Sequence, residues 1–186
     1  RHARLRESLI LLREKPRLIW LLLVVLAAGF GSDPVNTEAP AFARAFGHHD
    51  TFAGLILGAF GAGAVTAALL TAGREGSPRR TVLTLATLGG GIAAFSLVPS
   101  LAIGFPFLFA AGFGYLASNT RATTQLQLEV DESQRGRIMA LWSVAFLGLR
   151  PLASLTDGVL AGAFGVRVAG VVLALPAFAA AALIFG

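Results

Sequence analysis

The sequence predicts an all-α membrane protein, a bundle of six transmembrane helices. Of the 186 residues, 55% are apolar and only 13% are charged, whereas a soluble domain carries about 25% charged residues. Six predominantly apolar stretches, each close to the roughly 20 residues that a helix needs to cross a bilayer, use up almost the whole length. We therefore expect the lipid bilayer as the surrounding medium and no separate soluble domain.

The N-terminal region predicts a surface helix followed by the first span. Residues 1–17 hold basic side chains around a leucine-rich stripe, the pattern of an amphipathic helix lying on a membrane, and Pro16 is expected to end it. The first span is expected over residues 18–36, with Trp20 at the level of the lipid headgroups. From Asp33 to Asp50 the chain turns polar and net acidic, so we expect a loop there.

Five further spans come after it, separated by short connections. We expect these spans at residues 52–72, 81–98, 101–128, 138–162 and 168–185. The expected connections are a basic turn at 73–80, a tight hairpin at Pro99 and Ser100, a charged loop at 129–137 and a turn at 163–167. Residues 18–186 then form one transmembrane bundle behind the surface helix.

The distribution of Lys and Arg predicts the orientation of this bundle. Eleven of these residues fall in the N-terminal segment and in the loops on the same side of the membrane, against Arg44 and Arg167 on the other. Since Lys and Arg favour the cytoplasmic side, we expect a multi-pass protein of the cytoplasmic membrane with both termini in the cytoplasm. No aromatic-basic interleaving or binding motif accompanies the net charge of +5, so we expect no nucleic-acid partner.

The six spans also suggest an internal repeat of two three-helix units. The first and fourth spans both turn polar towards their C-terminal ends, and they cross the membrane in opposite directions. Equivalent polar ends would then face opposite sides, as an inverted-topology repeat requires. The other interpretation is that polar ends simply approach the headgroups.

The most informative polar residues lie in the fifth span. Spacings of seven, four and three residues place four of them on one stripe of an α-helix: Ser143, Arg150, Ser154 and Asp157. Arg150 lies about 20 Å beyond Arg137, deep in a hydrocarbon layer of about 30 Å, where a guanidinium normally faces a partner or a wet cavity. Two interpretations stay open for Arg150, a substrate or gating pathway and a structural ion pair. Asp157 is a pathway or proton-coupling candidate, or an ordinary charge at the outer interface.

Further candidates lie in the first and fourth spans. At the polar end of the first span, Asn36 is a candidate for the substrate pathway and Asp33 for proton coupling. The alternative for Asp33 and nearby Glu38 is that both are exposed carboxylates near a loop. In the fourth span, Asn119 and Arg121 are pathway candidates, although Asn119 also suits an interhelical hydrogen bond and Arg121 can extend to cytoplasmic water.

The sequence contains no enzyme signature. There is no P-loop, no HExxH pair, no cysteine and no histidine inside an expected span. His48 and His49 fall in the outer loop, where a solvated pair is one interpretation and a metal or pH-sensing role the other. We expect no catalytic activity, no metal and no cofactor.

A family resemblance is carried by residues 131–143, which read Asp-Glu-Ser-Gln-Arg-Gly-Arg-Ile-Met-Ala-Leu-Trp-Ser. The segment resembles the acidic Arg-Gly-Arg loop between the tenth and eleventh helices of major facilitator superfamily (MFS) transporters, in the enterobactin-exporter-like branch of transmembrane secretion effectors. The matching loop residues are Asp131, Arg135, Gly136 and Arg137. A second loop motif of the family survives only as Glu75, Arg79 and Arg80, which puts its gating role in doubt.

The resemblance covers essentially the whole chain and implies half of a twelve-helix fold, helices seven to twelve, with a preceding N-terminal six-helix half as partner. It implies alternating access and the proton-coupled export of small amphipathic molecules, such as a siderophore, a drug or a metabolite. The substrate itself is not identified, because six helices do not define a pocket made by twelve. The alternative is a non-transporting membrane scaffold or assembly protein, whose intramembrane charges would be structural pairs.

Overall fold

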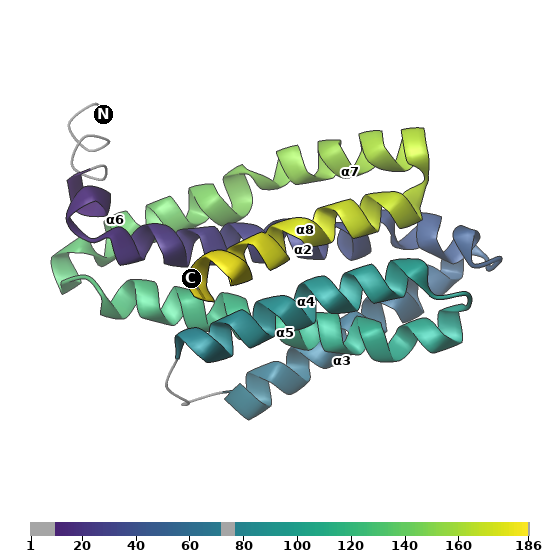
Figure 1. Ribbon diagram of the computed structural model, residues 1–186, viewed down its shortest axis with the longest axis horizontal. Coiled ribbons are helices and arrows are strands. Elements are labelled where there is room, and N and C mark those ends of the chain that lie inside the picture. The colour runs from purple at the N-terminus through teal and green to yellow at the C-terminus, as the bar shows by residue number, and fades with distance from the viewer. Residues whose placement is uncertain (1–9, 72–76, 186) are drawn as a thin grey trace.

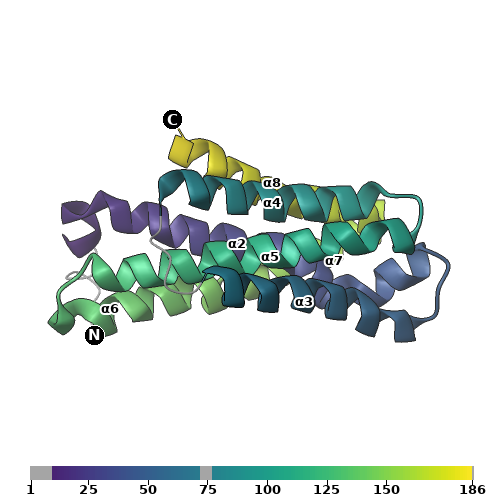
Figure 2. The same ribbon diagram turned by 90° about the horizontal axis from the view of Figure 1, so that it is seen from below.

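The computed structural model describes residues 10–71 and 77–185, and all regular structure in this part is helical. Six helical stretches are long and apolar enough to cross a membrane. This confirms the prediction of an all-α chain with six helices suited to crossing a membrane, as expected of a multi-pass membrane protein. The stretches run side by side as an elongated bundle in which α2 (Pro16–Ala45) begins and α8 (Val166–Phe185) ends toward the same end (Figure 1, Figure 2).

The first span is longer than the sequence suggested. Helix α2 continues to Ala45, so the loop expected from Asp33 to Asp50 is wrong over most of its length. Three polar side chains in this stretch donate hydrogen bonds to carbonyl groups three or four residues earlier: Ser32, Asn36 and Thr37. The helix also passes through Pro34 and Pro40, which membrane helices tolerate where neighbouring groups satisfy the freed carbonyls. A polar, proline-containing sequence therefore stays helical inside the bundle.

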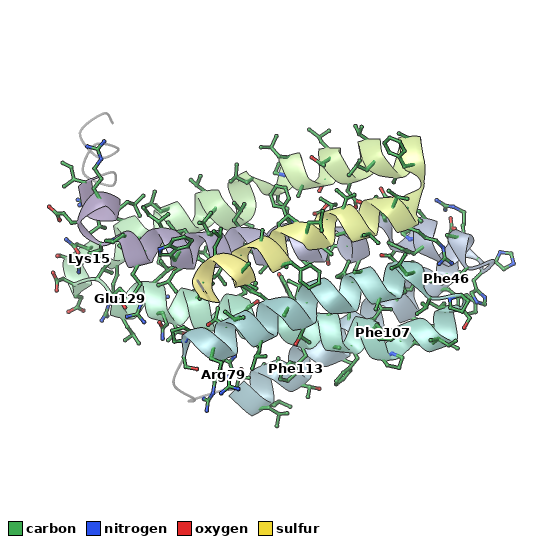
Figure 3. The ribbon with its side chains drawn as sticks, viewed as in Figure 1. Lys15, Phe46, Arg79, Phe107, Phe113 and Glu129 are labelled. Carbon is green, nitrogen blue, oxygen red and sulfur yellow. The ribbon has the colours of Figure 1, made fainter. Side chains whose placement is uncertain are left out.

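The chain before α2 is joined to the end of α5 (Leu101–Leu128). Residues 10–14 are helical and the break falls at Lys15, so Pro16 begins α2, a position that suits its fixed backbone angle. Lys15 Nζ donates to the Glu129 carbonyl at 2.7 Å, and Arg17 forms an ion pair with the Glu129 carboxylate at 2.7 Å. Lys15 and Glu129 thus lie together at one end of the bundle, with Phe46 at the other (Figure 3). Residues 1–9 of the expected surface helix lie outside the described residues.

Four helices form the interior. Helices α2 and α4 (Pro78–Leu97) contact each other, and each of them also contacts α5 and α8. Helices α4 and α8 lie along the same side of the bundle in Figure 2. The expected hairpin at Pro99 and Ser100 falls between α4 and α5. Of the expected turn at 73–80, residues 72–76 lie outside the described part, and Ser77 caps α4 by accepting a hydrogen bond from the Arg80 N–H.

Helix α3 (Ala53–Thr71), preceded by the short 3₁₀-helix η1 (Asp50–Phe52), packs on α5 at two glycines. A Cβ added at Gly63 would overlap the backbone of Phe109, and one added at Gly112 would overlap the backbone of Phe60. Since lipid offers no hydrophobic drive between helices, such small residues allow the close backbone contact that holds them together.

The fifth span consists of two α-helices joined by a wider turn. Helix α6 (Glu132–Ser143) is followed by the π-helix η2 (Val144–Gly148) and then by α7 (Arg150–Phe164). The charged loop expected at 129–137 is shorter than predicted, because α6 already begins at Glu132. Pro151 lies in the first turn of α7, where its missing N–H costs no helical hydrogen bond. Gly165 alone turns the chain into α8, with a positive φ of 89° that favours glycine.

Helices α3 and α7 lie at opposite edges of the bundle in Figure 1, and no contact joins them in the described part. Only 11% of the most apolar window of the fifth span and 22% of that of the second are buried, against 67% in α2. The two edge helices therefore expose most of their apolar surface to whatever surrounds this chain.

Candidate functional site

The candidate site lies where the middle of α2 meets the beginning of α7. Asp33 comes from α2 and Arg150 from α7, and both are far from the ends of their spans. Asp33 is fully buried, whereas the Arg150 side chain is 33% exposed. The sequence singled out both residues, and the structure brings them together.

The contact between these two residues is electrostatic and loose. Arg150 Nε lies 3.7 Å from Asp33 Oδ1, beyond the range of a good charge-assisted hydrogen bond. Asp33 receives a hydrogen bond from Ser154 instead, over 3.2 Å to the same oxygen. A buried carboxylate needs a cation or several donors to offset its lost hydration. Here it has Arg150 as the cation and the Ser154 hydroxyl as a donor, with the Thr37 hydroxyl at 3.4 Å from its other oxygen. The guanidinium is held near the carboxylate without being locked to it.

Asp157 is buried as well, one helical turn beyond Ser154 on the same face of α7. Its Oδ2 accepts a hydrogen bond from the Thr37 hydroxyl at 2.9 Å, while its Oδ1 is buried with no hydrogen-bond partner among the described residues. Asp157 is therefore covered by the rest of the chain and not exposed at its surface. No ion pair to it occurs within the described part of the chain, so its charge is less well compensated than that of Asp33.

Thr37 stands between the two carboxylates. Its hydroxyl lies 2.8 Å from the Asp33 carbonyl, 2.9 Å from Asp157 Oδ2 and 3.4 Å from Asp33 Oδ2. A hydroxyl has one proton to donate, so these acceptors compete for it. Thr37 is also exposed, so its hydroxyl links the exposed face of α2 to the buried carboxyl group of Asp157. Sequence reasoning missed Thr37 because it assigned the residue to a loop; its position four residues after Asp33 in a helix was the available signal.

Tyr115 of α5 is half-buried beside this site and packs against the core of the bundle. Its ring lies against Phe60 of α3, at 5.5 Å between ring centroids. Helix α5 also contacts α2, whereas the bonded groups of the cluster around Asp33 come from α2 and α7.

Ser143 does not belong to this cluster, so the predicted four-residue stripe is only partly correct. Ser143 is exposed and donates to the Met139 carbonyl within its own helix. The π-helix η2 lies between Ser143 and Arg150, and its i→i+5 hydrogen bonding adds about one residue to the turn, which rotates α7 by roughly 100° relative to α6. The stripe therefore holds only from Arg150 onward.

The candidates at the polar end of α5 contact other helices rather than Asp33. Arg121 Nη1 reaches the Arg80 carbonyl at the start of α4, at 3.4 Å. Asn119 has a buried side-chain oxygen with no hydrogen-bond partner in the described residues. On the same face as Asn119, Thr123 accepts a hydrogen bond from the Trp142 indole at 2.9 Å, and this bond joins α5 to α6. That contact agrees with the interpretation of this face as an interhelical one.

The remaining candidates lie away from the cluster. Asn36 is exposed on α2, one turn beyond Asp33, and Glu38 is half-buried. His48 and His49 are exposed, with the His48 ring stacked on Phe52. No group of three or more His, Cys, Asp or Glu that could hold a metal ion occurs in residues 10–71 and 77–185.

The loop-motif residues that the structure describes lie toward the end of the bundle where Lys15 and Glu129 meet. Arg79 and Arg80 are exposed in the first turn of α4, whereas Glu75 lies outside the described residues. Asp131, Arg135 and Gly136 are exposed around the start of α6, and Arg137 is half-buried there. Among those that the structure describes, no hydrogen bond or ion pair links a loop-motif residue to Asp33. The ion pair of Arg17 with Glu129 at the same end was not foreseen from the sequence.

Comparison of the chain with models of known protein families, with curated proteins and with solved structures gave no match. The likeness to MFS transporters in residues 131–143 therefore remains a resemblance. The function of the chain has to be inferred from the site itself.

Proposed function

We propose that this chain is the C-terminal half of an MFS-type secondary transporter, a proton-coupled exporter of small amphipathic molecules. The observation that supports this best is the loose pair of Asp33 and Arg150, which two different spans contribute near their middles. Ionisable groups are costly inside a membrane and mark substrate or proton pathways there. In secondary transporters such sites lie near the bilayer midplane.

Protonation of Asp33 would change how α2 and α7 are held together. The ionised carboxylate attracts the Arg150 guanidinium across 3.7 Å, whereas the neutral acid does not. A proton arriving at Asp33 therefore weakens the contact, and its departure restores it. Such a contact is a two-state element that a proton biases, which is the property alternating access needs. Thr37, exposed and bonded to Asp157, offers a route for the proton from the open face.

The exposed face of the chain supports a missing partner half. Helices α3 and α7 leave most of their apolar surface uncovered, and Asn36 and Thr37 are exposed on α2. Polar side chains near the middle of a span are unfavourable against lipid and normally face a bundle interior or a wet cavity. We infer that this face packs on a preceding six-helix bundle, with the substrate pathway between the two. Helices α2–α4 and α5–α8 are then the two inverted three-helix units.

In this assignment the basic end of the bundle, with Lys15, Arg79 and Arg135, lies in the cytoplasm and so do both termini. The reason is the preference of Lys and Arg for the cytoplasmic side. The membrane is the cytoplasmic membrane, and the partners are the lipid bilayer, the other half, protons and the exported molecule.

The test uses everted membrane vesicles that contain the full-length protein, energised by a pH gradient. Transport of ethidium, Hoechst 33342 and a catecholate siderophore is measured for the wild type and for Asp33→Asn, which mimics the protonated acid. We expect the variant to lose transport driven by the pH gradient but to keep exchange of labelled for unlabelled substrate, because exchange needs no net proton movement. Gradient-driven transport that persists in Asp33→Asn would contradict the coupling role.

The alternative function, a membrane scaffold, is favoured by one feature of the same site: Asp33 finds its cation within this chain and already ties α7 to α2. A scaffold should keep its function in the double variant Asp33→Asn/Arg150→Gln, provided that the protein still folds. Absence of proton-driven transport of every probe in the wild type would favour this alternative.

A further inference from the structure

A second candidate site lies at the basic end of the bundle, well away from Asp33. A cavity of about 370 Å³ opens between the start of α2, the start of α4 and the end of α8. Its size is at the lower end of the range of small-molecule sites, about 300–1,000 Å³. Its lining includes Arg17, Trp20, Leu21, Val24, Ser77 and Gln125.

The cavity changes from basic to apolar along α2. Arg17 stands at one end with a side chain that is 58% exposed, Trp20 is exposed next to it, and Val24 is buried at the other end. Seven residues of α-helix separate Arg17 from Val24, a depth of about 10 Å. An indole beside a guanidinium is the arrangement found at the headgroup level of membranes, with hydrocarbon beyond it. A ligand that fits must carry an anion at one end and an apolar chain at the other.

The polar end of the cavity offers donors as well as charge. The Arg17 guanidinium bonds Glu129 and Gln125, which uses two of its five N–H donors. The N-terminus of α4, capped by Ser77, adds the positive end of a helix dipole at the rim. Arg79, exposed in that same first turn, raises the positive potential further.

We propose that this cavity binds an anionic phospholipid from the adjoining leaflet. The phosphate lies against Arg17, and one acyl chain runs past Trp20 towards Val24. The headgroup is expected to be anionic, because basic residues near a membrane surface attract anionic lipids. The apolar inner part of the cavity favours a ligand with an acyl chain over a free phosphate ion. This site is independent of the proposed transport function, because Asp33 lies about 13 Å further along α2 than Val24.

Quenching of Trp20 fluorescence tests the proposal. The chain has two tryptophans, so Trp142→Phe leaves Trp20 as the reporter while it keeps an aromatic ring on Phe146. The purified chain is placed in phosphatidylcholine vesicles that contain rising fractions of phosphatidylglycerol with brominated acyl chains, or of phosphatidylcholine brominated in the same way. We expect half-maximal quenching at about a fivefold lower fraction of the anionic lipid, the factor that one basic residue near an anionic surface is worth. Wild-type protein, measured in parallel, must also be quenched at a lower fraction of the anionic lipid than of the phosphatidylcholine.

Two variants separate a built site from general attraction to the basic end. Arg17→Gln should abolish the preference for the anionic lipid, whereas Arg13→Gln, which removes the same charge from an exposed position outside the cavity, should keep it. Leu21→Phe, which fills the apolar wall, should weaken quenching by both lipids. Inorganic phosphate in excess should leave the quenching unchanged. Equal quenching by the two lipids, equal effects of Arg13→Gln and Arg17→Gln, or no quenching at all because protein covers the cavity would each overturn the proposal.

Discussion

The Thr37 hydroxyl of α2 donates to Asp157 of α7 across 2.9 Å, and it is the only hydrogen-bond donor to that carboxylate within the described part of the chain. This single bond therefore decides how a buried acid is accommodated. The second Asp157 oxygen has no hydrogen-bond partner there, so no other donor to this carboxylate remains if the Thr37 hydroxyl is removed.

Thr37→Val should destabilise the folded protein. Valine keeps the shape of threonine but removes the donor, which leaves both oxygens of Asp157 buried and unbonded at a cost of roughly 1–3 kcal/mol. Thr37→Ser keeps the hydroxyl and should stay close to the wild type. Thermal unfolding of the three proteins in one detergent measures the difference, and equal melting temperatures for the valine and serine variants would show that the bond contributes nothing.

Arg150→Leu should also destabilise the protein, because it leaves the Asp33 carboxylate buried without its cation. We expect about 3 kcal/mol or less, since the Arg150 side chain is 33% exposed and water compensates part of the loss. Adding Asp33→Asn should recover most of the stability, because no uncompensated charge then remains. The coupling energy from this double-mutant cycle is the measurement, and strictly additive effects would mean that the two residues do not interact.

Gly112→Ala should weaken the contact of α5 with α3. The added methyl group would overlap the backbone of Phe60, and overpacking of this kind typically costs 1–3 kcal/mol. Gly58→Ala is the matched control, because a Cβ at Gly58 meets nothing within 4 Å. Alanine also favours a helix over glycine, so the control should be neutral or slightly stabilising. A melting temperature for Gly112→Ala as high as that of the control would contradict the close contact.

Single-cysteine labelling can test the orientation, because the chain has no native cysteine. His48→Cys lies in the connection between α2 and α3, and Arg135→Cys lies near the start of α6; both positions are exposed. A membrane-impermeant maleimide added to intact cells should label His48→Cys and spare Arg135→Cys. Everted vesicles should give the opposite result, and the reverse pattern in both preparations would place the basic end outside.

The sequence predicted the six spans well, because apolar stretches about 20 residues long leave few other possibilities. It was wrong about the second half of α2. Pro34, Pro40 and several polar residues resemble a loop when only nearby residues are considered. This stretch packs against helices that come later in the chain, among them α7, more than a hundred residues away. Those contacts cannot be seen in the local sequence.

The site was predicted in part for the same reason. The cost of a charge inside a membrane was enough to select Arg150 and Asp157, because it depends on depth alone. The pairing of Arg150 with Asp33 depends on which helices are neighbours, and nothing in the local sequence of either residue specifies that. Ser143 was placed wrongly because a π-helix has no clear sequence signature.

The π-helix η2 determines which way the faces of α6 and α7 point relative to each other. Before it, Trp142 bonds Thr123 on α5; after it, Ser154 bonds Asp33 on α2. The π-helix rotates the part of the span after it by roughly 100° relative to the part before it. In an uninterrupted α-helix, Trp142 could face α5 or Ser154 could face α2, but not both. Removing one residue from Val144–Gly148 would turn Ser154 and Asp157 away from α2 without altering either of them. The chemistry of the buried acids thus depends on an apolar segment, Val-Ala-Phe-Leu-Gly, that carries no charge of its own.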